Sequence, residues 1–101
     1  MAVTIGEVRT FGDAKADKAQ VMKIIEETAE VFSAWEDWNG CGFDGRIGYE
    51  GYVEEAMRER LVDECADVVQ ALSNLLAALG VDDMQPAMSA CEARNMERGR
   101  L

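Results

Sequence analysis

The sequence contains no histidine, and its 101 residues include only ten basic side chains against twenty acidic ones. Without histidine the chain lacks the usual zinc ligand, the Glu-x-x-His pairs of di-iron helix bundles and the usual general base. Its formal net charge of −10 also argues against the basic face on which general nucleic-acid binding depends. Any catalysis by this chain must therefore depend on carboxylates.

Long hydrophobic runs are also missing. The longest nearly apolar stretch, residues 72–81, falls well short of the ~20 residues that a membrane-spanning helix needs. Residues 1–7 show neither a basic region nor an apolar core, so we expect no secretory signal. The three cysteines, Cys41, Cys65 and Cys91, are widely spaced and odd in number, as is typical of reduced thiols. We therefore expect a cytoplasmic protein with no membrane or nucleic-acid partner.

No alternating run of strand length is present, so the expected class is all-α, with residues 1–101 forming a single domain. Residues 1–12 are expected to form an N-terminal arm. Helical spacing of apolar residues predicts one long helix from Asp13 to Trp38 and an antiparallel one from Tyr52 to Leu79. The expected buried stripes are Val21, Ile25, Phe32 and Trp35 on the first helix and Leu61, Cys65, Val68, Leu72, Leu75 and Leu79 on the second.

Glycine and proline positions indicate where these helices end. Five of the nine glycines fall within residues 40–51, which predicts a loop between the long helices. Gly80 is expected to end the second helix, and Asp82 or Asp83 to cap a shorter helix through Met84–Arg98. The single proline, Pro86, is tolerable there only in the first turn. Three helices with 7% aromatic residues make a thin core, so we expect a homo-oligomer, a dimer or a tetramer.

Two pairs of acidic residues have the spacing of neighbours on one helix face. Glu27 and Glu30 form the first pair, and Glu64 and Asp67 form the second. Both pairs border an apolar stripe, so antiparallel packing could bring all four carboxylates together. Such a cluster would raise its own pKa values unless a cation neutralised it, and all-oxygen ligation suits Mg²⁺ or Mn²⁺. The residues leave open the alternative that each pair belongs to a solvated helix face.

The order of these motifs resembles the signature of a known family. Lys23, Glu26-Glu27-x-x-Glu30 and Glu64-x-x-Asp67 look like the motifs of the MazG-like all-α nucleoside triphosphate pyrophosphohydrolases. Asn74 and the ending Asn95-Met96-Glu97-Arg98-Gly99-Arg100 extend the resemblance, which covers nearly the whole chain.

The resemblance implies a Mg²⁺-dependent hydrolysis of a nucleoside triphosphate, ribo or deoxy, to the monophosphate and pyrophosphate, as in nucleotide-pool housecleaning. Mn²⁺ is a possible substitute for Mg²⁺. The implied metal ligands are Glu27, Glu30, Glu64 and Asp67. The implied catalytic residues are Glu27 and Glu26, the latter as a further ligand or water-orienting base.

Five further residues are candidates for substrate binding. Lys23 is placed to bind a phosphate or to form an ion pair with Glu27. Arg98 is a phosphate candidate or a cation that favours a helix C-terminus, and Asn95 stands where family members carry lysine. Trp38 could stack on a base or pack in the core, and Asn74 could bind a sugar or base or be a buried helix contact.

Two other interpretations are compatible with the sequence. The main alternative is a non-catalytic helical dimerisation or adaptor module. In such a module the acidic residues would only form a solvated surface. A carboxylate-bridged di-iron bundle ranks last, because both Glu-x-x-His motifs are missing.

Overall fold

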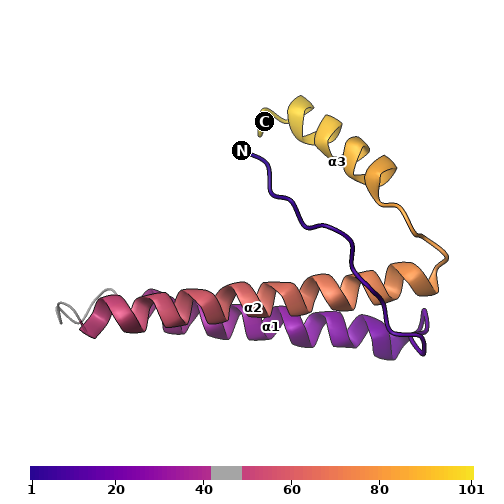
Figure 1. Ribbon diagram of the computed structural model, residues 1–101. Helices are drawn as coiled ribbons and strands as arrows, with labels where there is room; N and C mark the ends of the chain where they lie inside the picture. The colour runs from indigo at the N-terminus through magenta and orange to yellow at the C-terminus, as the bar shows by residue number, and fades with distance from the viewer. Residues whose placement is uncertain (42–48) are drawn as a thin grey trace.

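The computed structural model describes residues 1–41 and 49–101, and the side chains of helix α2 from residue 53 onward. It contains three helices, α1 (Lys18–Gly40), α2 (Tyr49–Ala78) and α3 (Gln85–Glu97), and no strand occurs within the described ranges. The predicted all-α class is confirmed. Helices α1 and α2 lie side by side as a hairpin, and α3 stands apart from it (Figure 1).

The boundaries of the hairpin differ in part from the prediction. Helix α1 begins at Lys18 rather than at Asp13, because Asp17 adopts an extended backbone and its side chain accepts a hydrogen bond from Gln20 N at 3.0 Å. This N-cap satisfies one of the free N–H groups of the first turn. Of the predicted glycine loop, Gly40 lies within α1 and Gly51 within α2, while residues 42–48 lie outside the described residues.

Gly80 ends the second helix as predicted. Its φ of +79° is a left-handed conformation that costs glycine little. Gly80 N donates to the carbonyl of Ala77 and Val81 N donates to the carbonyl of Leu76, both at 2.9 Å, which is the Schellman arrangement. The last helical residue is Ala78, one residue before the predicted end.

Helix α3 begins at Gln85, and its cap differs from the prediction. The capping position is Met84, whose side chain makes no capping hydrogen bond. Asp83, one residue further out, accepts a hydrogen bond from Gln85 N at 2.9 Å through its side chain. Pro86 lies in the first turn, where its missing N–H is not needed.

The face of α1 that packs on α2 lies one residue away from the predicted stripe. The predicted stripe residues of α1 are exposed, and on α2 only Leu61, Val68 and Leu75 of the predicted set are half-buried. Two parallel stripes run along α1, and in a two-helix hairpin only one of them meets a neighbour. The stripe that packs, every member at least half-buried, is Gln20, Ile24, Glu27, Val31, Ala34 and Trp38.

The hairpin has little core of its own. The buried apolar residues are Ala34 and Ala71, and no large side chain is fully buried among those described. Within the described residues, α1 and α2 pack on each other and α3 packs on neither. None of the described helices is long and apolar enough to cross a membrane.

Candidate metal centre and adjoining cavity

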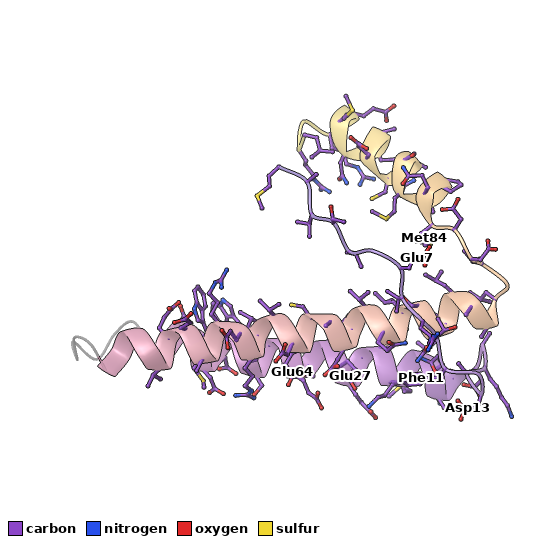
Figure 2. All side chains as sticks on the ribbon, viewed as in Figure 1. Glu7, Phe11, Asp13, Glu27, Glu64 and Met84 are labelled. Carbon is purple, nitrogen blue, oxygen red and sulfur yellow. The ribbon has the colours of Figure 1, made fainter. Side chains whose placement is uncertain are left out.

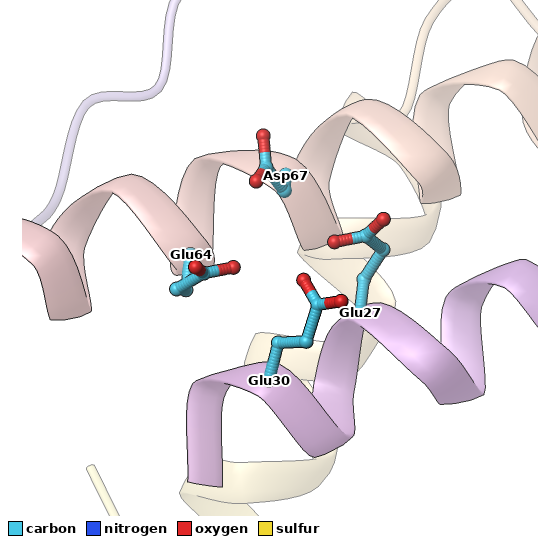
Figure 3. Close-up of side chains that lie close together, drawn as sticks. All are labelled: Glu27, Glu30, Glu64 and Asp67. Carbon is cyan, nitrogen blue, oxygen red and sulfur yellow. The ribbon is translucent and has the colours of Figure 1, made fainter. Parts of the chain in front are cut away.

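The hairpin brings four carboxylates together at the middle of its length. Glu27 and Glu30 extend from α1 toward Glu64 and Asp67 on α2 (Figure 3). One oxygen from each of the four lies within 4.8 Å of the others. The i,i+3 spacing on each helix and the antiparallel packing together account for this convergence.

Burial distinguishes the members of the cluster. Glu27 occupies the packed face of α1 and is only 8% exposed, and Glu64 is half-buried on the packed face of α2. The Oε2 atoms of both residues are buried and find no hydrogen-bond partner in the described part of the chain. A buried oxygen without a partner is unfavourable, and a cation bound beside these two atoms would relieve that cost.

The charges of the cluster act on one another. The negative charge of Glu27 is the main cause that raises the pKa of Glu30, and hydrogen bonds with Glu27 and Glu64 raise it further. The pKa of Glu27 is lowered, chiefly by a hydrogen bond from Lys23, whose Nζ lies 2.7 Å from Glu27 Oε1. A proton on Glu30 or an added cation would relieve the repulsion among the four carboxylates.

An open cavity of about 540 Å³ adjoins the carboxylates. Glu27 and Asp67 belong to its lining, so the cavity and the cluster share two residues. The other lining residues come from the N-terminal segment and from the two helices: Phe11, Asp13, Ala14, Lys15, Asp17, Ala19, Gln20, Lys23, Gln70, Ala71 and Asn74.

The N-terminal arm forms one wall of this cavity. Phe11 N donates to Asn74 Oδ1 and Gln70 Nε2 donates to the carbonyl of Arg9, both at 3.0 Å. Gln70 Nε2 also lies 3.0 Å from Asn74 Oδ1. Figure 2 shows Phe11 at the end of the hairpin where α1 begins, with Glu27 further along it. The arm is therefore held across the same hairpin face that carries the cavity.

Two of the predicted substrate-binding residues lie at this site. Lys23 lines the cavity and forms the ion pair with Glu27. Asn74 also lines the cavity, and it is only 4% exposed because it holds the arm. Lys23 therefore forms the ion pair that the sequence left open, whereas Asn74 is buried as a contact of the arm rather than of another helix. Both residues also line the cavity.

The structure does not bring the other predicted residues to the cluster. Trp38 Nε1 donates to Glu54 Oε1 at 2.8 Å, and eleven residues, or about 16 Å along the helix, separate Trp38 from Glu27. Asn95 and Arg98 lie in and at the end of α3, which packs on neither hairpin helix within the described residues. Glu26 is exposed and is not one of the four clustered carboxylates.

Several lining residues were not predicted from the sequence. Gln70 follows Asp67 by three positions and precedes Asn74 by four, so helical spacing alone could have placed it on this face. Phe11 and Lys15 carry no such signal, because their position depends on where the arm crosses the hairpin.

No protein-family model, curated protein or solved structure matches this chain. Evidence for its function therefore comes from its own residues. Four carboxylate oxygens beside an open cavity lined by acidic, basic and polar side chains are suited to hold a hard divalent cation next to a bound small molecule.

Proposed function

We propose that the protein is a Mg²⁺-dependent nucleotide pyrophosphohydrolase that cleaves a nucleoside triphosphate, ribo or deoxy, to the monophosphate and pyrophosphate. The observation that carries the proposal is the convergence of Glu27, Glu30, Glu64 and Asp67, in which two buried Oε2 atoms have no partner among the described residues. The resemblance of the same residues to the MazG-like motifs supports this choice of reaction. A role in the nucleotide pool would place the protein in the cytoplasm.

The residues of the cluster fit Mg²⁺ or Mn²⁺ by their chemistry. All four donors are carboxylates, which hard cations prefer, and the two partnerless oxygens would gain a ligand. When bound, the cation would polarise phosphate oxygens and lower the pKa of a bound water, so that the missing histidine is not needed as a base.

The remaining residues of the site would bind and orient the substrate. Lys23 keeps 55% of its side chain exposed while it pairs with Glu27, so its ammonium has donors free for a phosphate. Glu26 would orient the attacking water or serve as a further ligand. Asn95 and Arg98 would reach a phosphate only after α3 moves or from another copy, because α3 stands apart from the hairpin (Figure 1).

The cavity is large enough for the nucleoside part. Its volume of about 540 Å³ lies within the ~300–1,000 Å³ range of small-molecule sites. Gln70 and Asn74 offer amide groups, and the ring of Phe11 offers an apolar surface. With the base at the arm, the triphosphate would extend along Lys23 toward the carboxylates.

The test is a panel of ribo- and deoxynucleoside triphosphates incubated with Mg²⁺ and assayed for pyrophosphate. We expect release of pyrophosphate with at least one nucleotide, and loss of it in Glu27→Gln and Asp67→Asn with the helical circular dichroism unchanged. Glu55→Gln is the matched control, because Glu55 is an exposed acid of α2 that lies nine residues before Glu64. Full activity in both cluster variants would refute the assignment.

The second candidate is a non-catalytic dimerisation or adaptor module. The observation that favours it is the set of large apolar side chains exposed along α1 and α2. Absence of pyrophosphate with every nucleotide would support this candidate, and Mg²⁺-stimulated release would refute it. A di-iron bundle stays last, because the sequence has no histidine ligand.

A further inference from the structure

The segment that leads into α1 forms one wall of the cavity, although it buries little of itself against the hairpin. We name residues 9–17 the strap, which includes the end of the N-terminal arm. The strap begins at Arg9, whose carbonyl binds α2, and ends at Asp17, the N-cap of α1. Thr10 and Ala14 are half-buried, and the other residues of the strap are exposed. Apolar packing therefore contributes little to its position.

Hydrogen bonds to α2 dock the strap. Among the described residues they run from Phe11 N to Asn74 Oδ1 and from Gln70 Nε2 to the carbonyl of Arg9, both at 3.0 Å. The ring of Phe11 remains 60% exposed. A segment with so few buried contacts opens locally at a lower cost than the helices unfold. The strap can therefore leave α2 while α1 and α2 stay packed.

The cavity lies between the strap and the two helices. Phe11, Asp13, Ala14, Lys15 and Asp17 line it from the strap, and the remaining lining residues belong to α1 and α2. A molecule that fills the cavity contacts both walls only while the strap is docked. Binding of such a molecule and docking of the strap therefore stabilise each other, because a ligand favours the state in which it makes more contacts.

The charges of the lining indicate which kind of ligand gains most from a docked strap. Lys15 and Lys23 are the two cations of the lining, and Lys23 pairs with Glu27 at 2.7 Å. Within the described part of the chain, no carboxylate lies at ion-pair distance from Lys15. The ammonium of Lys15 is therefore available to an anion, and it is the strap that brings it to the cavity.

We propose that the strap closes on a bound nucleotide, with Lys15 donating to its phosphate groups, and that the nucleotide in turn holds the strap on α2. This inference rests on the proposed function for the identity of its ligand. It adds a phosphate-binding residue that the hairpin alone does not supply, and a closing step that accompanies binding. Asp13 lies in the same wall and opposes the attraction, because its carboxylate repels phosphate.

The experiment measures hydrogen exchange of the Phe11 amide with and without a nucleotide that cannot be cleaved to pyrophosphate. The probes are the α,β-methylene analogues of the ribo- and deoxynucleoside triphosphates with Mg²⁺, and calorimetry gives the Kd of each. A ligand that binds only the docked strap makes opening rarer by one plus the ratio of its concentration to Kd, so at a hundred times Kd we expect about 100-fold slower exchange. The amide of Gly99 is the control, since it donates to the carbonyl of Met96 at 3.0 Å outside the cavity and should exchange unchanged.

Variants of the strap test its charges. Lys15→Met should raise the Kd of the analogue about tenfold, which is the loss expected for one charge-assisted hydrogen bond. Lys18→Met is the matched control, because Lys18 is an exposed lysine outside the cavity lining and should leave the Kd unchanged. Asp13→Asn should lower the Kd, since it removes the repulsion. Helical circular dichroism should be the same in all three variants.

The outcomes separate this inference from the proposed function. An analogue that binds while the Phe11 amide keeps its exchange rate would overturn closure of the strap and leave the proposed reaction in place. Equal Kd values for Lys15→Met and Lys18→Met would overturn the role of Lys15. Slower exchange without release of pyrophosphate from any natural nucleotide would support the strap and refute the reaction. Failure of every analogue to bind would overturn both.

Discussion

Replacing Asn74 with alanine removes the side-chain oxygen that holds the N-terminal arm. Asn74 Oδ1 accepts hydrogen bonds from Phe11 N and Gln70 Nε2, both at 3.0 Å, and the residue is only 4% exposed. The bond from Gln70 lies within α2, so the bond from Phe11 N is the one that joins Asn74 to the arm. A hydrogen bond of this kind contributes about 1 kcal/mol net to the docked arm. That difference corresponds to a roughly 5-fold larger population of the open arm, at about 1.4 kcal/mol per factor of ten.

Native-state hydrogen exchange of the Phe11 amide measures this population directly. We expect exchange to be about 5-fold faster in Asn74→Ala and tryptic cleavage after Arg9 to accelerate in parallel. Asn74→Asp is the control, because it keeps an oxygen acceptor at the same position and should keep most of the protection. Unchanged exchange in Asn74→Ala would show that the arm is held by other contacts, and the account of the cavity wall would be wrong.

Three further predictions concern the proposed metal site and one helix end. The raised pKa of Glu30 means that its proton stabilises the fold at low pH, and that this contribution is lost as the pH rises through that pKa. In EDTA, Glu30→Gln should therefore raise the melting temperature at neutral pH but not at acidic pH, and an equal shift at both would contradict this. Mg²⁺ at a hundred times its Kd should stabilise the wild type by about 2.7 kcal/mol, or about 10–20 °C by thermal denaturation, and should leave Asp67→Asn nearly unshifted. Gly80→Ala places a Cβ at a φ of +79° and should cost about 1–2 kcal/mol in urea denaturation, whereas Gly12→Ala, at a position without positive φ, should cost little.

The parts of the structure that depend on local spacing could be predicted from the sequence. The all-α class, the Gly80 helix end and the pairing of Glu27 with Glu30 and of Glu64 with Asp67 all follow from residues within one or two turns of each other. To predict the antiparallel hairpin from these local features, only one long-range assumption is needed, namely that the two helices pack along their acidic pairs.

The parts that depend on long-range contacts could not be predicted. The cavity wall is set by hydrogen bonds between residues 61 and 63 positions apart, from Gln70 to Arg9 and from Phe11 to Asn74. The packed stripe of α1 lies one residue away from the predicted stripe, also because the choice between the two depends on contact with another helix. Hydropathy favours the larger residues of the predicted stripe, such as Phe32, over Ala34, although the close approach of two helices favours the small residue.

The arm is attached to α2 through its backbone, since the groups that Asn74 and Gln70 bind are the amide of Phe11 and the carbonyl of Arg9. Every amino acid except proline supplies both groups, so the side chains at these two positions are free to change while the attachment persists. The helices fix the geometry of the four carboxylates, and the arm presents an exchangeable set of side chains to the cavity. Under the proposed function, substitutions at residue 11 would change the side chain beside the nucleotide without disturbing the carboxylates, so that selectivity could evolve independently of the reaction.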